Sequence, residues 1–145
     1  MTNDEERRLA ADLFNQVWSL LDKKDRTREE DDAMLHAAHA SRHHWGRVGA
    51  PVNLARGEWQ VSRVYAVLRR GEPAGYHARR CLEICEANKI GDFDLAYAYE
   101  ALARAAAVER RSEDLERYRA LARKAAEAIA KKEDRELFEN DMAGL

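Results

Sequence analysis

Four side chains on one segment have residue types that bind metal ions. Asp32, His36, His39 and His43 follow one another at spacings of four, three and four residues, which places them within about 60° of arc on one face of a helix. Imidazole and carboxylate groups ligate metals in helical bundles. The apolar residues of this segment define a different side as the core, so we expect a solvated or partner-facing stripe. A metal-dependent enzyme or sensor using His36, His39 and His43 is the alternative hypothesis.

A second set of possible ligands, His77, Cys81 and Cys85, repeats at four-residue spacing. Thiolate and imidazole groups bind zinc, but the sequence has no C-x-x-C motif and no further cysteine pair. Nothing near either thiol in the sequence indicates an activated nucleophile. We therefore expect Cys81 and Cys85 to be small buried hydrophobic residues where helices approach closely, and we expect no metal or other cofactor.

Aromatic, arginine and glutamate side chains recur on two predicted helices that are apolar on two sides. A helix of this kind is normally held between layers or has one side in contact with a partner. Aromatic and arginine side chains dominate the binding energy of many protein interfaces. The alternative is that Trp59 belongs to the core and the charges only flank it. The candidate partner-binding residues are Arg56, Trp59, Arg63, Tyr97, Glu100 and Arg104.

Signatures of other functions are missing from the sequence. There is no P-loop, no dinucleotide-binding glycine motif, no H-E-x-x-H and no nucleophile elbow. The 25 Lys+Arg and 27 Asp+Glu give a net charge of −2, so no basic field predicts nucleic-acid binding. No apolar run approaches the roughly 20 residues that cross a bilayer, and two cysteines in the whole chain fit a reducing cytosol. We expect a cytoplasmic protein without catalytic activity that binds a protein or peptide partner, or a second copy of itself.

The elements that position these residues are predicted to be helices only. Apolar residues recur with helical spacing, and no segment alternates like a half-buried strand. By length, residues 1–145 form a single all-α domain. Sparse Gly and Pro residues divide it into antiparallel hairpins over about 4–45, 51–89 and 92–131, followed by a terminal helix over about 133–142.

Several helix ends are predicted from individual residues. Thr27 and Glu30 form a capping box at the start of the second helix. Pro51 fits the first turn of the third helix, where its missing N–H costs nothing. Gly71 is expected to end that helix, and Ser112 to cap the sixth.

The segment 55–89 resembles a tetratricopeptide repeat, a helix–turn–helix unit of 34 residues with small and large side chains at fixed positions. Ser62, Ala74 and Cys81 match small positions of that pattern, and Tyr65 matches its aromatic position. The segment departs from the pattern elsewhere: Trp is displaced by one position, and Ala78 and Glu86 stand where an aromatic residue and a proline are usual.

A weaker unit of the same kind covers residues 97–131, with Leu115 at the position that corresponds to Ala74. The resemblance implies six helices stacked as a short α-solenoid, a right-handed superhelix, plus the short terminal helix. It also implies that the concave side of the stack binds a peptide or another protein. A plain helical bundle without a binding surface is the alternative.

Overall fold

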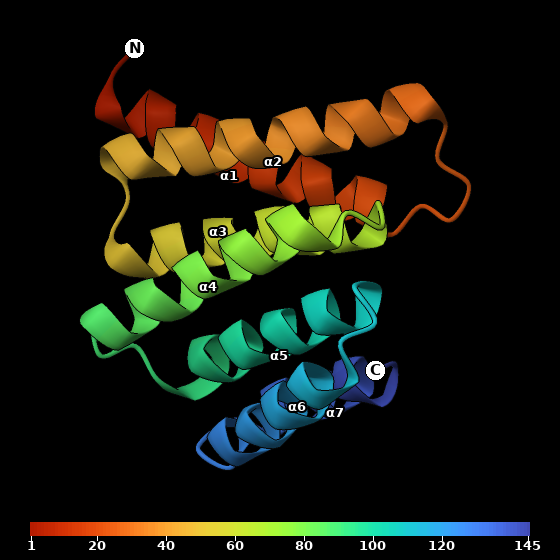
Figure 1. Cartoon of the computed structure of the whole chain (residues 1–145). Coiled ribbons are helices and arrows are strands. Elements are labelled where there is room, and N and C mark those ends of the chain that lie inside the picture. The colour runs from red at the N-terminus through yellow and green to blue at the C-terminus, as the bar shows by residue number, and fades with distance from the viewer.

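The computed structural model describes all 145 residues, and it contains helices and connecting turns but no β-strand (Figure 1). The predicted all-α fold, with six longer helices and a short terminal one, is therefore confirmed. In chain order the helices are α1 (Asn3–Leu21), α2 (Arg28–Val48), α3 (Pro51–Val67), α4 (Gly71–Ala87), α5 (Asp92–Val108), α6 (Ser112–Ala126) and α7 (Lys132–Ala143).

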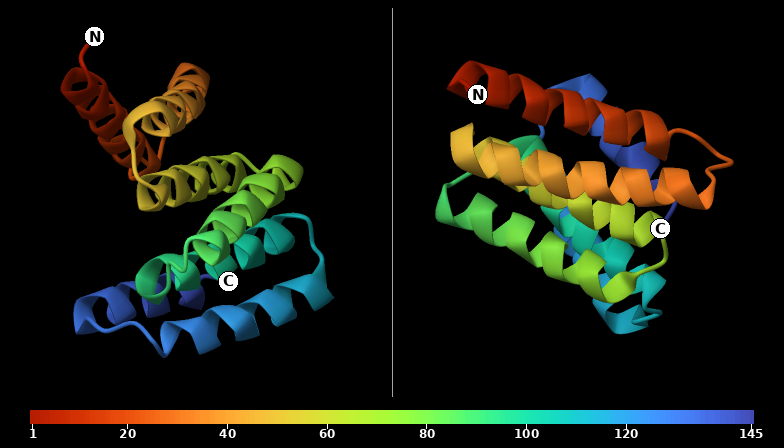
Figure 2. Two further views of the ribbon diagram at one scale, coloured as in Figure 1. Left: turned by 90° about the vertical axis from the view of Figure 1, so that its left-hand side faces the viewer. Right: turned by 90° about the horizontal axis from the view of Figure 1, so that it is seen from above.

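Helices that are neighbours in sequence are also neighbours in space. The pairs α1/α2, α3/α4 and α5/α6 have the most extensive contacts, and α2/α3 and α4/α5 join these pairs to one another. Because the connections are short, each helix packs antiparallel to the one before it. Helix α7 packs against α5 and α6, and α3 also touches α5. Helices α1 and α7 lie at opposite ends of this series but on the same side of the molecule (Figure 2).

The start of α2 forms as predicted. The Glu30 N–H donates to Thr27 Oγ1 at 3.1 Å, and the Thr27 N–H donates to Glu30 Oε1 at 2.9 Å, which completes the capping box. Pro51 occupies the first position of α3. The prediction for α6 is wrong, because the cap position is Arg111 and Ser112 is already the first helical residue, without a capping hydrogen bond.

Three consecutive turns, after α3, α4 and α5, share one conformation. Each contains a non-glycine residue with positive φ, at 66° for Arg69, 54° for Lys89 and 58° for Arg110. The N–H after each of these residues donates to a carbonyl five positions back, as in a Schellman helix end. These bonds run from Arg70 to Tyr65 at 2.8 Å, from Ile90 to Cys85 at 2.9 Å and from Arg111 to Ala106 at 2.9 Å.

The predicted role of Gly71 as the end of α3 is wrong, because a non-glycine residue occupies the left-handed position in the turn after this helix. Helix α3 ends at Val67, the left-handed position falls on Arg69, and Gly71 is the first residue of α4. Gly71 is needed instead for close approach between helices. A Cβ atom at Gly71 would lie 2.3 Å from Glu109 Cγ and 3.3 Å from Val108 Cγ1, at the end of α5.

The core is divided among the helix contacts rather than gathered in one place. Val17, Met34, Val61 and Val64 are buried where α1, α2 and α3 meet. A second cluster, which includes Phe138, joins α5, α6 and α7. No helix here is both long enough and apolar enough to span a membrane.

Small residues let α3 and α4 approach closely. Ser62 is buried, and its hydroxyl donates to the Ala74 carbonyl at 2.8 Å. Ala74 and Ala78 are both fully buried. A larger side chain at any of these positions would push the two helices apart.

Candidate functional site

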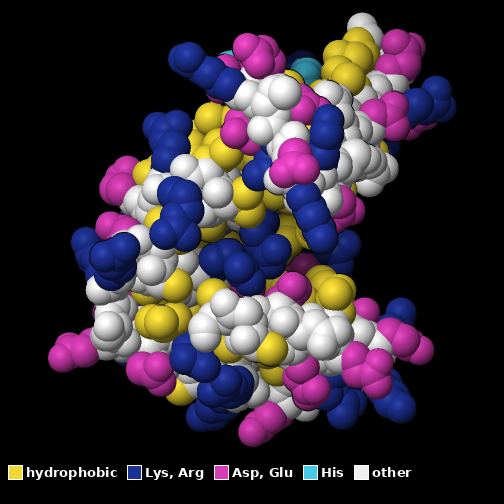
Figure 3. Space-filling model, turned by 90° about the vertical axis from the view of Figure 1, so that its right-hand side faces the viewer, with side chains coloured by type: hydrophobic (Ala, Val, Ile, Leu, Met, Phe, Trp, Pro, Cys, Tyr) yellow, Lys and Arg dark blue, Asp and Glu magenta, His cyan; other side chains and the backbone are white.

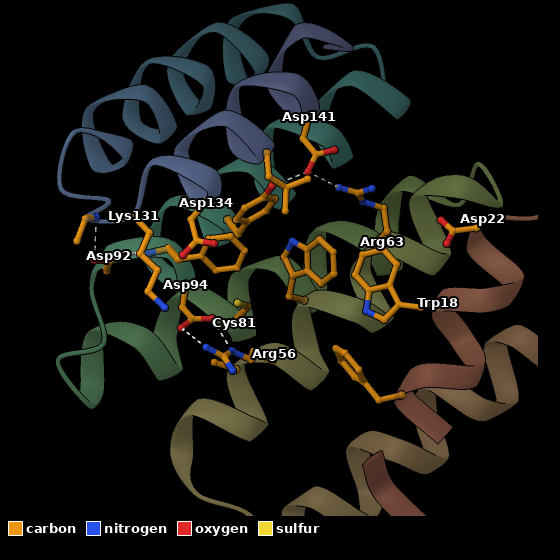
Figure 4. Close-up of a pocket in the computed structure, with 17 residues that line it drawn as sticks. Trp18, Asp22, Arg56, Arg63, Cys81, Asp92, Asp94, Lys131, Asp134 and Asp141 are labelled. Atoms are coloured by element: carbon orange, nitrogen blue, oxygen red, sulfur yellow. Dashed lines mark hydrogen bonds and ion pairs between the residues drawn. The ribbon is translucent and has the colours of Figure 1, made fainter. Parts of the chain in front are cut away.

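The side of the molecule between α1 and α7 is hollowed into a cleft of about 860 Å³. The space-filling view shows the hollow between the upper part of the molecule, formed by α1 and α2, and the lower part, formed by α6 and α7 (Figure 3). Side chains from α1, α3, α5 and α7 line it, together with Cys81 of α4 and Ala130 and Lys131 before α7 (Figure 4). We call this hollow the aromatic cleft.

The floor of the aromatic cleft is a chain of rings from α1, α3 and α5, and Phe138 of α7 supports it from the core behind. The ring centroids of Trp18 and Trp59 lie 5.6 Å apart, those of Trp59 and Tyr97 5.7 Å apart, and those of Tyr97 and Phe138 5.4 Å apart. Phe93 packs on Tyr97 with its centroid at 4.6 Å. Such pairs bury large apolar areas and hold each ring in a fixed orientation. The rings of the floor are therefore held in place by one another.

The structure brings four of the six candidate partner-binding residues together. Arg56, Trp59, Arg63 and Tyr97 all line the aromatic cleft. Glu100 does not: its side chain is 0% exposed, so the expectation that it contributes to a partner-facing surface is corrected. The side chain of Arg104 is 22% exposed and lies beside Glu100, behind the lining residues.

Glu100 serves instead as the buried anchor of a charge network behind the cleft. Its carboxylate accepts hydrogen bonds from Arg63 Nη2 at 3.4 Å and from Arg104 Nη2 at 3.2 Å. A buried carboxylate needs such partners, because an unpaired charge in the interior is costly. The network orients Arg63, so Glu100 acts on the cleft through a side chain that lines it.

Tyr97 and Asp141 extend this network to α7. The Tyr97 hydroxyl donates to Asp141 Oδ2 at 2.5 Å, and Arg104 Nη2 donates to the Asp141 carbonyl oxygen at 3.5 Å. Burial, followed by the hydrogen bond to the Asp141 carboxylate, raises the pKa of Tyr97 far above its usual range. The phenol thus stays protonated and remains the donor that ties α5 to the α7 wall.

The rim of the cleft carries charged groups of both signs. Arg56 binds Asp94 through two hydrogen bonds, Nε to Oδ1 at 2.9 Å and Nη2 to Oδ2 at 3.1 Å. The hydrogen bond with Asp94 is the main cause that raises the pKa of Arg56. Figure 4 places Asp22 at one end of the cleft and Asp134 near the other. No ion pair engages Asp22, Asp134 or Lys131 within the chain.

The histidine stripe of α2 lies outside the aromatic cleft. Asp32, His36, His39 and His43 are exposed, and His39 Nε2 also lies 2.8 Å from the Tyr65 hydroxyl of α3. The whole stripe is therefore exposed, as expected, and His39 in addition contacts α3. No three His, Cys, Asp or Glu side chains converge to form a metal-binding group, at this stripe or elsewhere.

His39 belongs to a group of side chains in contact between α2, α3 and α4, which we call the histidine seam. It comprises His39, Tyr65, His77, Glu58 and Arg42. The His39 and His77 ring centroids lie 5.5 Å apart, and His77 stacks on Tyr65 with its centroid at 5.8 Å. Glu58 Oε1 lies 2.8 Å from His77 Nδ1, and Glu58 Oε2 accepts from Arg42 Nε at 2.6 Å.

Burial shifts the pKa values of two groups in the seam. Desolvation of the His39 ring, reinforced by the nearby His77, lowers the pKa of His39. Burial would raise the pKa of Glu58, but the hydrogen bond with His77 and the charge of Arg42 outweigh it, and the pKa is lowered. Glu58 is thereby held as a carboxylate that its two neighbours satisfy.

The two cysteines have the buried, unbridged character expected from the sequence. Cys81 and Cys85 are free, and they pack with Ala55 and Ala98 in one apolar cluster. The hydrogen bond between the two thiols and burial raise the pKa of Cys81. A thiol with a raised pKa is a poor nucleophile at neutral pH.

Sequence reasoning missed two walls of the aromatic cleft. Phe14 and Trp18 of α1 and Leu137 of α7 line it, but none of them is among the six candidate partner-binding residues. The four-residue spacing of Phe14 and Trp18, beside the stripe that contains Val17, is the signal that indicates a second apolar side of α1.

Compared with known proteins, the chain matches no family model, no curated protein sequence and no solved structure.

Proposed function

We propose that this protein is a non-catalytic interaction or scaffold module that binds a peptide, or a segment of another protein, in the aromatic cleft. One observation carries the proposal: a cleft of about 860 Å³ with an aromatic floor. Binding clefts typically enclose about 300–1,000 Å³ and are lined by apolar and aromatic groups with a few fixed polar ones. The aromatic cleft has this composition.

The rigidity of the lining also supports the proposal. Trp59 and Tyr97 are held by ring contacts on both sides, and Arg63 is oriented by Glu100. A binding surface that is ordered before the partner arrives loses less conformational entropy on binding. Large aromatic side chains and arginines that are fixed in this way are typical of the residues that dominate binding energy.

We further propose that the helices form a tetratricopeptide-like stack, a short right-handed solenoid whose concave side is the aromatic cleft. The odd-numbered helices α1, α3, α5 and α7 supply most of the lining. In a stack of helical hairpins, the first helix of each hairpin faces the concave side in the same way. The close contact of Ser62 with Ala74 fits the small positions of that repeat.

We propose a cytoplasmic location for the interaction. The two free thiols support it, since a reducing compartment keeps cysteines unbridged.

Selection from a random dodecapeptide library tests the binding proposal. The matched variants are Leu137→Ser, at a leucine that lines the cleft and is 51% exposed, and Leu121→Ser, at a leucine on α6 that is 37% exposed and lies outside it. Neither variant removes core packing, so both should keep the helical circular dichroism of the parent.

We expect the parent to enrich peptides that bind it and the Leu121→Ser variant equally well. Binding to Leu137→Ser should be about fivefold weaker, because an apolar contact of about 1 kcal/mol is lost. Trp18 and Trp59 provide an intrinsic fluorescence signal within the cleft. No enrichment, or enriched peptides that do not distinguish the two variants, would overturn the proposal.

A further inference from the structure

The charges around the aromatic cleft do not balance. Its lining includes five aspartates but only two arginines and one lysine. Both arginines already have partners within the chain: Arg56 binds Asp94, and Arg63 binds the buried Glu100. The unpaired groups at the cleft are therefore mainly carboxylates. They are Asp22, Asp92 and Asp134, against Lys131.

These carboxylates come from separate parts of the chain. Asp22 follows α1, Asp92 begins α5 and Asp134 lies in the first turn of α7. Asp92 accepts hydrogen bonds from the backbone N–H groups of Phe93 and Ala130, which fix its position but leave its charge without a cationic partner. Figure 4 shows acidic groups toward both ends of the cleft, with the aromatic floor between them.

The floor strengthens the effect of these charges. A hollow with apolar walls concentrates the electrostatic potential of the charges at its rim and attracts ions of the opposite sign. Aromatic faces also attract cations directly. The chain already contains an example inside the cleft, because the Arg63 guanidinium carbon lies 5.0 Å from the centre of the Trp59 ring.

From this combination we infer that the segment bound in the aromatic cleft is a basic peptide, with lysine or arginine residues on both sides of a large apolar side chain. The apolar side chain would pack on the floor near Trp18 and Leu137, and the cationic groups would meet Asp22 at one end and Asp134 at the other. This inference rests on the proposed function and specifies the chemistry of the partner.

The charge composition of the peptides selected from the library tests the inference. We expect the enriched dodecapeptides to have a positive net charge relative to the starting library. The strongest sequence is then synthesised in three forms with the same apolar residues, in which its basic positions are kept, replaced by glutamine or replaced by glutamate. Titration should give at least tenfold weaker binding for the glutamate form, and the difference should shrink between about 50 and 500 mM salt.

Variants of the cleft then locate the attraction. Asp22→Asn and Asp134→Asn should each weaken binding of the basic peptide about two- to fivefold and leave the glutamine form unchanged. Lys131→Gln should strengthen it by a similar factor, since a repulsive charge is removed. Glu113→Gln is the matched control: Glu113 is exposed on α6 and lies outside the cleft, and its substitution changes the net charge of the chain equally.

The outcomes separate this inference from the proposed function. Enriched peptides that are neutral or acidic, and that still lose affinity with Leu137→Ser, would overturn the basic partner and leave a binding cleft. Basic peptides that bind the Asp22→Asn and Asp134→Asn variants as well as Glu113→Gln would also overturn it, as would self-association of the protein that Leu137→Ser abolishes. Failure to enrich any peptide would overturn both proposals.

Discussion

The aromatic cleft and the histidine seam are built from similar side chains but differ in where those side chains find their partners. In the seam, Glu58 is satisfied by Arg42 and His77, and His39 is satisfied by Tyr65. In the cleft, the aromatic floor faces a hollow, and the aspartates at its rim outnumber the cations. The polar groups of the seam have partners within the chain, whereas the cleft leaves apolar surface and carboxylates that a partner would cover under the proposed function.

The difference shows that residue type and spacing do not identify a binding site by themselves. The sequence pattern of His36, His39 and His43 is more regular than any pattern in the cleft, yet His39 is used to join helices. Trp18, Trp59 and Tyr97 are far apart in sequence, yet their rings form one surface. A function is better inferred from groups that the chain leaves unsatisfied than from groups that resemble a motif.

The largest effect is expected from removing the support of the α7 wall. Phe138 is 1% exposed and packs in the cluster that joins α7 to α5 and α6. Phe138→Ala should lower the free energy of unfolding by about 3–5 kcal/mol, the usual cost of a large cavity. Urea unfolding measures this, with Leu137→Ala as the control, which should change stability by less than about 0.5 kcal/mol. Equal effects of the two variants would show that α7 is not docked as described.

A smaller effect is expected from the two buried carboxylates, one in each region. Glu100→Gln and Glu58→Gln should each lower the free energy of unfolding by about 1.5–3 kcal/mol, because each weakens hydrogen bonds to charged groups. Only Glu100→Gln should also weaken peptide binding, since Glu100 orients Arg63 in the cleft lining. Titration of both variants with one selected peptide checks this. A loss of binding in Glu58→Gln alone would show that the seam, and not the network behind the cleft, supports peptide binding.

Within the seam, the hydrogen bond between Tyr65 and His39 should contribute modestly. Tyr65→Phe keeps the ring contacts with His39 and His77 and removes only the hydroxyl. We expect the free energy of unfolding to fall by about 0.5–1.5 kcal/mol. Tyr76→Phe is a suitable control, because Tyr76 is 50% exposed and its hydroxyl makes no hydrogen bond within the chain. If both variants behave alike, the His39 contact does not stabilise the seam.

The seam should also respond to pH. Because the pKa of His39 is lowered in the folded state, the unfolded chain binds this proton more readily. The contribution of neutral His39 to stability is complete above the unfolded pKa of about 6.5 and is lost as the pH falls below it. The free energy of unfolding should therefore decrease less between pH 7 and 5 in His39→Gln than in the parent. His43→Gln is the control, at a histidine that makes no hydrogen bond within the chain, and it should follow the parent.

The smallest effect is expected from metal ions. Added zinc should leave the midpoint of thermal unfolding unchanged, because no three ligand side chains converge and His39 Nε2 is engaged with Tyr65. Calorimetry with and without the ion tests this. A rise in the midpoint that His39→Gln abolishes would restore the metal hypothesis for His36, His39 and His43.

Much of the fold follows from local sequence, and less of the site does. Thr27 and Glu30 specify a helix start because their hydrogen bonds lie within four residues of one another. The prediction that Gly71 ends α3 was wrong because this glycine is needed for close approach to Val108 and Glu109. The sequence alone does not show that these residues lie nearby. Arg56, Trp59, Arg63 and Tyr97 were identified from helices that are apolar on two sides. Glu100 was misplaced because helical periodicity gives a direction but not the depth of burial.

What the sequence determined by itself is a series of amphipathic helices with defined starts and short connections, since these depend on interactions between residues close in the chain. What only the tertiary structure decided is which polar and aromatic groups remain without partners. Tyr97 finds Asp141, and His39 finds Tyr65, across long stretches of sequence. The Asp22 and Asp134 carboxylates form no ion pair within the chain. Satisfaction of a side chain is a property of the packed molecule, because its partner can come from any helix that the fold brings alongside.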